Sequence, residues 1–417
     1  MKTRMALSLS LALVFYISGI TAAAQKNRQT GEREIIELGV RQELRSSILK
    51  SSRWLLISTP RGYETGKERY PVIFTLDGRS NFEHMTAAAR FLALTGAIPP
   101  VIVVGIESHD RGLDYTLPTT SGRMPPGMTG KTGGALQFLE FIEKEAVPFI
   151  EKEYRAQPFR ALAGHSLGGL FATYAYYAKP ELFKGVVALD PSIFWNEGQA
   201  VRELSAFLTK EKLEAARRFF LGRTAVAREI WSDDSKAMVS SVERMQKRGA
   251  LFAFQEAPNG RVERLGESHQ TMVYPMSYIG LKHMFSDYYF RNVEADLAPS
   301  PDITRNLTVA DIRAYYEGLS KKYGYRVEIP EGVLDRHGRD QAVLKQPEKA
   351  ISALQLNVKM HPRSLNAQLT LGSVAARLGR SDLARQAYEE AYKLAVESSS
   401  PAAADIKAAL EAIGKQM

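Results

Sequence analysis

The ten residues Ala161-Leu-Ala-Gly-His-Ser-Leu-Gly-Gly-Leu170 carry the clearest structural signal in the chain. Three apolar residues typical of a strand, Ala161 to Ala163, lead into Gly164-His-Ser-Leu-Gly168, and an apolar segment of helical period, Leu170 to Ala178, follows. A Gly-x-Ser-x-Gly sequence between a strand and a helix is typical of a sharp, strained turn that lifts a serine hydroxyl clear of its surroundings. The glycines are needed because a side chain at either position would collide with neighbouring backbone. Ser166 is therefore the candidate nucleophile.

On both sides of this stretch, apolar runs of strand length alternate with longer segments of helical period. The alternation predicts crossover connections, and hence an α/β fold with a doubly wound, mostly parallel sheet. The expected strands are Trp54–Thr59, Val72–Leu76, Val101–Ile106, Ala161–Ala163, Val186–Leu189, Phe219–Leu221 and Leu251–Phe254. The expected helices between them include Phe82–Leu94, Leu136–Tyr154, Leu170–Ala178, Ser235–Lys247 and Met272–Phe285.

A second domain is expected after about Asn292, where the alternation stops. At 417 residues the chain exceeds the size of one hydrophobic core. We predict a catalytic domain over residues 25–292, a linker over residues 293–308 that contains two prolines, and a helical domain over residues 309–417.

The helical domain contains an internal repeat of 34 residues. Ala350, Leu354 and Met360 recur as Ala384, Tyr388 and Leu394. This spacing resembles tetratricopeptide repeats, of which fewer units are visible than a free-standing array needs. Two interpretations stay open, a helical cap docked on the catalytic domain and a surface that binds a protein partner.

Residues 1–24 are typical of an export signal. Lys2 and Arg4 precede an apolar run from Ala6 to Ile20, and three alanines follow at positions 22–24. The run is short for a membrane span. We therefore expect an exported protein, periplasmic or secreted, with no stable membrane insertion after signal removal; a retained anchor is the alternative.

Composition excludes several kinds of chemistry and partner. The chain has no cysteine, which excludes disulfides, thiolate zinc sites and a cysteine nucleophile. We expect no metal and no cofactor. The formal net charge is +9, but the basic residues are scattered and do not alternate with aromatic residues, so no nucleic-acid partner is expected.

His269 is the candidate base for Ser166. A serine hydroxyl needs a base to remove its proton, and the usual order along the chain in this kind of fold is serine, acid, histidine. His269 follows the last expected strand, Leu251–Phe254, where the base should lie. His283, inside the last helix of the sheet domain, is the fallback.

The acid is expected after the strand Phe219–Leu221, where Glu229, Asp233 and Asp234 all lie. We take Asp234 as the candidate, with Asp233 and Glu229 as alternatives. Asp233 and Asp234 also precede an expected helix, where capping and the helix dipole would explain them equally well. A Ser-His dyad without an acid is a further possibility.

An oxyanion hole needs backbone donors aimed at the charge of a tetrahedral intermediate. One donor should be the amide of Leu167, the residue after the nucleophile. The second should come from the turn after Val72–Leu76, which offers the amides of Gly78 and Arg79.

Taken together, several segments resemble the putative esterase family of α/β hydrolases, which includes esterase D, siderophore esterases, feruloyl esterases and mycolyltransferases. The matching segments are Tyr70–Gly78, Val104–Glu107, Arg111 with Asp114–Thr116, Phe141–Ile142 through Tyr154–Arg155, Gly164–Gly169 and Asp190–Trp195. The resemblance covers about residues 35–290 and is nearest to the siderophore esterases. It implies an α/β-hydrolase sheet and ester hydrolysis at Ser166 with His269, and some members carry a tetratricopeptide-like C-terminal tail.

The resemblance also implies a substrate pocket near Asp114, Tyr115 and Trp195. Arg111 could meet a carboxylate or catecholate of the substrate, or form a surface salt bridge. The chain departs from the family pattern where Asp190 replaces the usual serine ahead of Pro191, and where residues 224–234 lack a clear acidic signature.

The interpretation that follows is a serine carboxylic ester hydrolase that acts on a small-molecule ester. The alternatives are an acyltransferase that uses the same serine and histidine, and a non-catalytic protein whose helical tail binds a partner.

Overall fold

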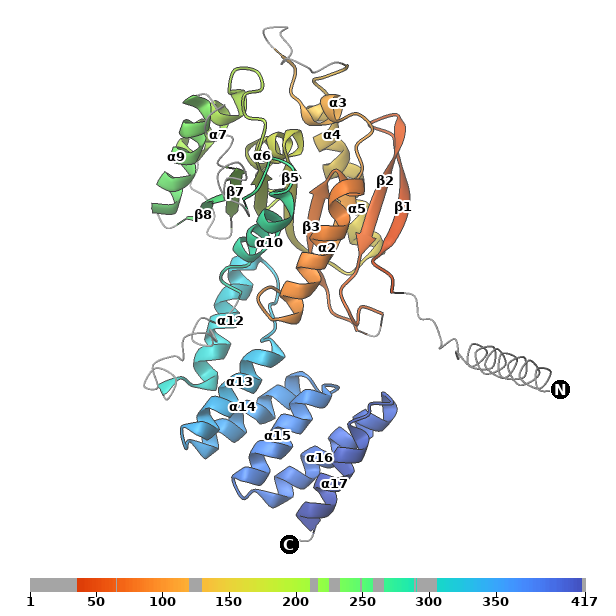
Figure 1. Cartoon of the computed structure of the whole chain (residues 1–417), viewed down its shortest axis with the longest axis vertical. Helices are drawn as coiled ribbons and strands as arrows, with labels where there is room; N and C mark the ends of the chain where they lie inside the picture. Colours follow the sequence, from red (N-terminus) through yellow and green to blue (C-terminus); the bar gives the residue numbers. More distant parts are fainter. Residues whose placement is uncertain are drawn as a thin grey trace, which may run out of the picture. The chain divides into compact units, whose positions relative to one another are not determined.

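The structure is a computed structural model of the chain that describes residues 36–64, 66–119, 130–210, 217–224, 233–247, 250–257, 266–288, 290 and 306–414. The chain divides into two compact units, residues 1–38 and residues 39–417. Every helix and strand below belongs to the second unit (Figure 1).

The catalytic part is built on an eight-stranded sheet with the order β1-β2-β4-β3-β5-β6-β7-β8. Strand β2 is antiparallel to β1 and β4, and the strands from β4 to β8 pair in parallel. The mostly parallel, doubly wound sheet predicted from the alternation is confirmed. The strands are β1 Val40–Ser46, β2 Ser51–Ser58, β3 Tyr70–Leu76, β4 Ile102–Ile106, β5 Ala156–His165, β6 Gly185–Leu189, β7 Arg218–Thr224 and β8 Leu251–Ala257.

Helices cover both faces of the sheet, as Figure 1 shows. Alternate strand residues face opposite layers: Val187 lies against Gly280 of α10, whereas Phe219 packs edge-on against Tyr176 of α6. The helices of this part are α2 Gly78–Leu94, α3 Arg111–Tyr115, α4 Ala135–Phe141, α5 Val147–Glu153, α6 Leu167–Ala178, α7 Gln199–Lys210, α9 Asp233–Lys247 and α10 Val273–Met284.

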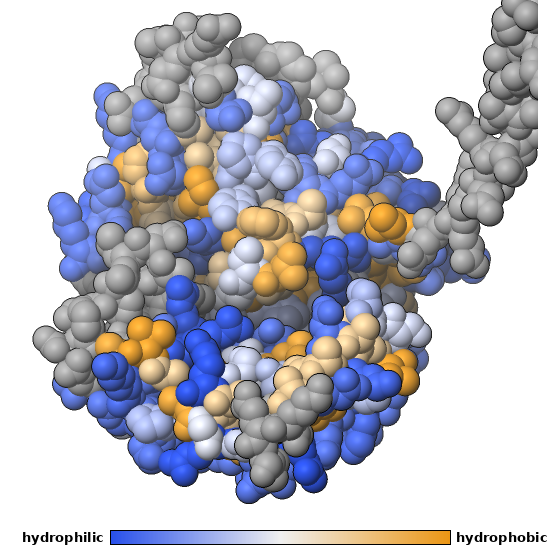
Figure 2. Space-filling view, turned by 60° about the horizontal axis from the view of Figure 1, so that its bottom comes forward, coloured by the Kyte–Doolittle hydropathy of each residue, from blue (hydrophilic) through white to orange (hydrophobic). Residues whose placement is uncertain are grey.

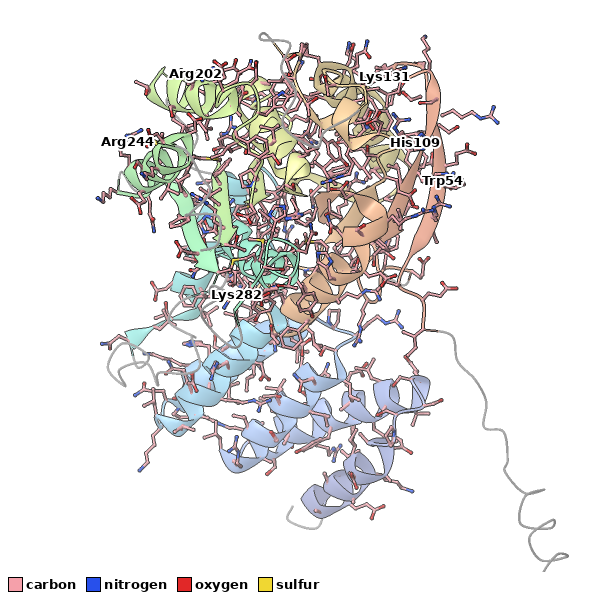
Figure 3. The ribbon with its side chains drawn as sticks, turned by 45° about the horizontal axis from the view of Figure 1, so that its top comes forward. Trp54, His109, Lys131, Arg202, Arg244 and Lys282 are labelled. Carbon is pink, nitrogen blue, oxygen red and sulfur yellow. The ribbon has the colours of Figure 1, made fainter. Side chains whose placement is uncertain are left out.

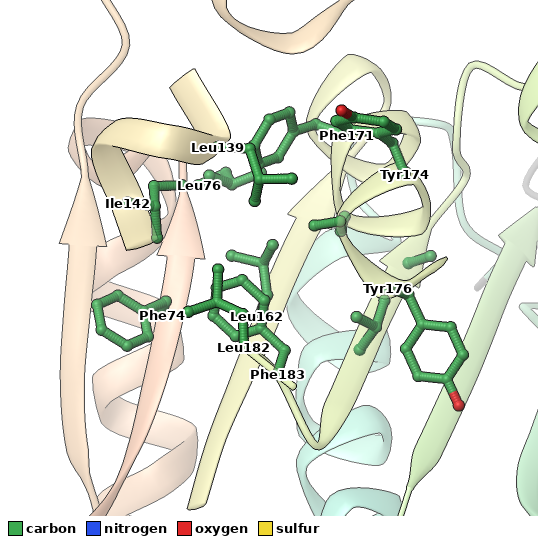
Figure 4. Close-up of a cluster of buried hydrophobic side chains, with 14 of the residues drawn as sticks. Phe74, Leu76, Leu139, Ile142, Leu162, Phe171, Tyr174, Tyr176, Leu182 and Phe183 are labelled. Atoms are coloured by element: carbon green, nitrogen blue, oxygen red, sulfur yellow. The ribbon is translucent and has the colours of Figure 1, made fainter. Parts of the chain in front are cut away.

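The core between the sheet and the α4–α6 layer consists of large apolar side chains. Figure 4 shows Phe74 and Leu162 of the sheet below Leu139 and Phe171 of the helices, and all four are buried. This packing fixes the position of α6, whose first turn carries the site.

The predicted helix over Leu136–Tyr154 is interrupted. A π-helical turn, η1 Ile142–Ala146, separates α4 from α5. Pro148 lies in the first turn of α5, and because proline has no N–H it cannot continue the regular hydrogen-bond ladder.

The C-terminal part is helical, with α12 Val309–Tyr323, α13 Glu331–Val343, α14 Pro347–Met360, α15 Leu365–Arg377, α16 Ser381–Glu397 and α17 Ala403–Gly414. Ala350 and Leu354 of α14 are fully buried, as is Ala384 at the repeat-related position of α16. The assignment of these helices to tetratricopeptide repeats stays a prediction. The face of the molecule seen in Figure 2 is largely hydrophilic, and its hydrophobic residues form separate patches.

Helix α12 docks on the catalytic part through Asp287. This carboxylate accepts a hydrogen bond of 2.6 Å from the Tyr323 hydroxyl, pairs with Arg218 at 2.6 Å and also pairs with Lys322. The Tyr323 ring stacks on Phe159 with ring centroids 5.1 Å apart. Arg218 begins β7, so the helical part is attached at the amino ends of the parallel strands.

Some predictions fall outside the described residues, namely the export signal over residues 1–24 and most of the linker over residues 293–308. Within the described ranges, the helices are all too short or too polar to span a bilayer.

Candidate active site

Ser166 lies in the turn between β5 and α6 and has φ 59° and ψ −118°. Its N–H donates to the Leu189 carbonyl oxygen of β6 at 2.9 Å, which holds the strained residue at the carboxyl edge of the sheet. A Cβ on Gly164 would lie 2.2 Å from the Gly168 carbonyl oxygen, so only glycine fits there. At Gly168 the nearest atom is 3.3 Å away, a carboxylate oxygen of Asp77, so that position is tight but less restricted.

His269 is held in a short turn that leads into α10. The Ser268 N–H donates to the Thr271 hydroxyl at 2.8 Å, and the Thr271 N–H donates back to the Ser268 hydroxyl at 3.1 Å. These reciprocal bonds fix the backbone on both sides of the imidazole. His269 Nδ1 lies 2.9 Å from Asp190 Oδ2.

Asp190 follows β6 directly and is almost completely buried, with 1% of its surface exposed. The Thr224 hydroxyl donates to Asp190 Oδ2 at 2.8 Å and the Thr224 N–H donates to Oδ1 at 3.3 Å. A carboxylate fixed in this way sets the imidazole tautomer, because it accepts the Nδ1–H and leaves Nε2 free to take a proton.

The carboxylate beside His269 is therefore not the one expected from the sequence. Asp233 and Asp234 lie in the first turn of α9, where acidic side chains complement the helix dipole. Asp233 pairs with Lys236 at 3.6 Å, and the Asp234 carboxyl group lies where a Cβ on Gly198 would be. Glu229 lies outside the described residues.

Two other histidines, His283 and His109, lie away from Asp190 and His269. His283, the fallback base, contacts the Leu251 carbonyl oxygen at 3.0 Å, at the amino end of β8 and so at the opposite edge of the sheet. His109 lies beside β2, where its Nδ1 is 3.2 Å from Arg53 (Figure 3).

A second hydroxyl lies beside the nucleophile. Ser192 Oγ is 3.3 Å from Ser166 Oγ, and the Ser192 N–H donates to the Ser166 carbonyl oxygen at 3.0 Å. The turn after β6 thus supplies both the carboxylate that holds His269 and a hydroxyl partner for Ser166.

The three predicted oxyanion donors are amides in the first turns of two helices. Leu167 begins α6, and Gly78 and Arg79 begin α2. Amides in a first helical turn have no acceptor within their helix and carry the positive end of the dipole. The Asp77 N–H just before α2 donates to the Tyr115 hydroxyl at 3.1 Å, which fixes this loop.

Arg111 connects the two loops. Its Nε and Nη2 donate to the two carboxylate oxygens of Asp77 at 2.7 and 3.1 Å, and Nη2 also donates to the His165 carbonyl oxygen at 3.3 Å. Arg111 thus lies next to the nucleophile. Because its side chain is 44% exposed, it remains open to a ligand. Burial raises the pKa of Asp77, against the opposing effect of Arg111.

The other three predicted pocket residues are buried, contrary to expectation. Asp114 pairs with Arg53 at 3.2 Å and accepts from Ser108 at 2.8 Å. Tyr115 supports the Asp77 loop, and the Trp195 indole donates to the Leu117 carbonyl oxygen at 3.0 Å. Each is at most 2% exposed, so none of the three side chains is open to a ligand.

Within the described residues, His, Asp and Glu side chains form no group of three suited to a metal ion.

The mostly parallel sheet, with Ser166 in the elbow after β5 and His269 paired with Asp190, is that of an α/β hydrolase of the serine type. A family model described as putative esterase matches residues 46–247. The siderophore enterobactin esterase of Emericella nidulans is 32% identical over 231 residues, which cover 51% of this chain and 74% of that protein. The chain belongs to the putative esterase family.

Two further relatives are similar over shorter regions. The ferri-bacillibactin esterase BesA of Bacillus subtilis is 37% identical over 158 residues, 34% of this chain and 55% of that protein. The siderophore triacetylfusarinine C esterase of Aspergillus fumigatus is 33% identical over 162 residues, 36% of this chain and 53% of that protein. The matched regions span about half the length of both relatives.

Solved structures share the fold. An IroE-like serine hydrolase from Shewanella oneidensis is 26% identical with a TM-score of 0.62, over 76% of this chain and 98% of its own. An uncharacterised protein from Capnocytophaga ochracea is 16% identical with a TM-score of 0.58, over 90% of this chain and 99% of its own. The second likeness concerns the fold alone, and it extends over most of the chain.

Proposed function

We propose that the chain is a serine carboxylic ester hydrolase that forms an acyl-enzyme on Ser166, with His269 as the base and Asp190 as the acid. The observation that carries this proposal is the 2.9 Å contact between His269 Nδ1 and the buried Asp190 carboxylate, at the sheet edge where Ser166 is held in its strained turn.

The chemistry follows from these positions. As His269 Nε2 accepts the hydroxyl proton, Ser166 Oγ attacks the ester carbonyl carbon and the carbonyl oxygen becomes an oxyanion near the amides of Leu167, Gly78 and Arg79. The intermediate collapses, His269 gives its proton to the leaving alcohol, and the acyl group stays on Ser166. Water, activated by His269, then attacks the acyl-enzyme, releases the acid and restores the serine.

For the substrate we propose an ester of the siderophore type. Support comes from the three curated relatives, each named as an esterase of a siderophore. The partly exposed Arg111 beside the nucleophile fits a substrate with an anionic or metal-chelating oxygen group close to the scissile ester.

The test uses a fluorophosphonate probe on the whole protein. Wild type should be labelled and Ser166→Ala should not, because the probe reacts with an activated serine hydroxyl. Either an unlabelled wild type or a labelled alanine variant contradicts the mechanism. Asp234→Asn is the matched control and should label as wild type does.

A panel of esters then tests the substrate class. Trilactone and catechol-amide siderophore esters should be cleaved with a higher kcat/KM than phenyl esters of simple fatty acids. A preference for simple acyl esters would contradict the siderophore proposal while leaving the hydrolase mechanism in place. Transfer of the acyl group to an added alcohol, with no free acid, would instead favour the acyltransferase.

We also propose export, on the sequence of residues 1–24 alone. The mature protein isolated from its host should begin near Gln25, and an intact N-terminus on the purified cellular protein would contradict this.

A further inference from the structure

Two imidazoles lie against each other at the site, and the reaction described above uses only one. The rings of His165 and His269 have centroids 4.4 Å apart and planes inclined by 43°. The His269 side chain is 44% exposed, whereas His165 is only 7% exposed. His165 ends β5, and His269 arrives from a turn more than a hundred residues later in the chain.

His165 also contacts the backbone that carries the base. A hydrogen bond joins its ring to the backbone of His269. Its Nε2 is buried and has no partner among the described residues, so we assign the bond to the other ring nitrogen. The His165 carbonyl oxygen is itself held by Arg111 at 3.3 Å.

The surroundings of His165 disfavour the protonated form of its ring. Burial lowers the pKa of His165 to about 4, and the adjacent His269 contributes to the lowering, as does Arg111; the bond to the His269 backbone and the Asp190 carboxylate oppose this effect. A histidine of this kind is neutral at pH 7. A ring with so low a pKa does not accept the serine proton, which the proposed reaction passes to His269.

We infer that His165 is a positioning residue for His269, an inference that rests on the proposed function. Its ring and its bond to the backbone hold the loop of the base over Ser166. Its aromatic face also stabilises the imidazolium that His269 becomes in the transition state, since aromatic faces attract cations within about 6 Å. His165 exchanges no proton with the substrate.

The first test replaces the ring. His165→Leu should lower kcat about tenfold, the effect of one partly exposed cation–ring contact together with a loosened loop, and should leave KM within about twofold. The ring stabilises the imidazolium of the transition state, so its loss should move the acid limb of kcat/KM against pH to lower pH, by less than about one unit. His165→Phe keeps an aromatic face and should keep the acid limb where wild type has it.

His337→Leu is the matched control. His337 is 2% exposed in α13, and burial lowers its pKa to about 4, so it is a second buried, neutral histidine. Its loss should leave kcat and the acid limb unchanged.

The inference is overturned if His165→Leu keeps the wild-type kcat and acid limb, or if only KM changes. Fluorophosphonate labelling of wild type distinguishes this outcome from failure of the proposed function. If wild type is not labelled, the proposed hydrolase mechanism is wrong. If wild type is labelled, only the proposed role of His165 is wrong. If His165→Leu does not fold, NMR titration of wild type decides, since His165 should titrate near its lowered pKa of about 4. Titration of His165 at its ordinary pKa of 6.5 would overturn the proposal.

Discussion

Three residues at the carboxyl edge of the sheet have positive φ: Asp77 at 54°, Ser166 at 59° and Asp190 at 39°. Each directly follows a parallel strand, β3, β5 or β6. Such conformations cost roughly 1–3 kcal/mol for a residue other than glycine. Hydrogen bonds across the sheet offset this cost, since Ser166 N–H donates to Leu189 and Asp190 N–H donates to Gly222. The strained backbone turns abruptly after each of these strands, so that the residue after the strand contributes to the site.

Asp190→Asn tests the acid at the residue scale. An amide in place of the carboxylate favours the wrong imidazole tautomer, so kcat should fall about 10⁴-fold with the fold intact. Steady-state kinetics and a melting curve measure both effects. Asp233→Asn and Asp234→Asn are controls of the same chemistry and should stay within about threefold of wild type. A severe loss in either control would return the acid to the loop after β7.

Ser166 and His269 could be proposed from the sequence because a motif marks the first and chain order marks the second. Asp190 could not, since the acid was expected one strand later. The signal was present as the departure at the position before Pro191, but sequence alone does not show that Thr224 of β7 and His269 converge on that carboxylate. The sequence also does not show which side chains are buried, and so Asp114 and Trp195 were expected in the pocket although both are buried.

At the scale of elements, the turn between β5 and α6 tolerates little change. Gly164→Ala would place a methyl group 2.2 Å from the Gly168 carbonyl oxygen, and the backbone must move to relieve the contact. We expect the free energy of unfolding to fall by at least about 3 kcal/mol.

Gly318→Ala is the matched control for that substitution. Gly318 lies within α12, and a Cβ added there would have no neighbouring atom within 4 Å. Alanine there should raise the free energy of unfolding by up to about 1 kcal/mol, because it favours the helix. Urea unfolding measures both changes, and a smaller effect at Gly164 than at Gly318 would contradict this account of the turn.

Each predicted strand overlaps a strand of the structure, because buried parallel strands are nearly continuous apolar runs, although several ends differ by two to five residues, as at the start of β5. Strand β1 has no such run, and its residues at the edge of the sheet are mostly exposed. Helix α7 was missed as well, although its residues alternate polar and apolar at helical spacing. Periodicity thus detected the buried parallel strands but missed the exposed edge strand β1 and the amphipathic helix α7, whose Val201 and Leu204 are buried.

At the scale of the whole molecule, Asp287 links the catalytic and helical parts. Burial alone would raise the pKa of Asp287, but Arg218, Lys322 and Tyr323 hold the pKa below its ordinary value of 3.8. A carboxyl group with a depressed folded-state pKa stabilises the fold above the unfolded pKa. That stabilisation is lost as the pH falls through the lower folded value.

Asp287→Asn should therefore lower the free energy of unfolding at pH 7 by about 3 kcal/mol, since it leaves the buried Arg218 without its carboxylate. Below about pH 4, the free energy of unfolding of the variant should also fall less steeply with decreasing pH than that of wild type. Unfolding curves from pH 7 to pH 3 measure both. Conversely, kcat for a small ester should be unchanged, and a tenfold loss would show that the docking contact reaches the site.

The attachment of α12 at the amino ends of the strands has a practical consequence. Phe159, which stacks on α12, and Ser166 are seven residues apart along β5 and its turn, or roughly 23 Å for extended chain. A bead, a surface or a fusion partner joined to the protein through its last helix would thus leave the candidate active site around Ser166 unobstructed. Immobilised in this orientation, the hydrolase should turn over bulky esters as readily as it does free in solution.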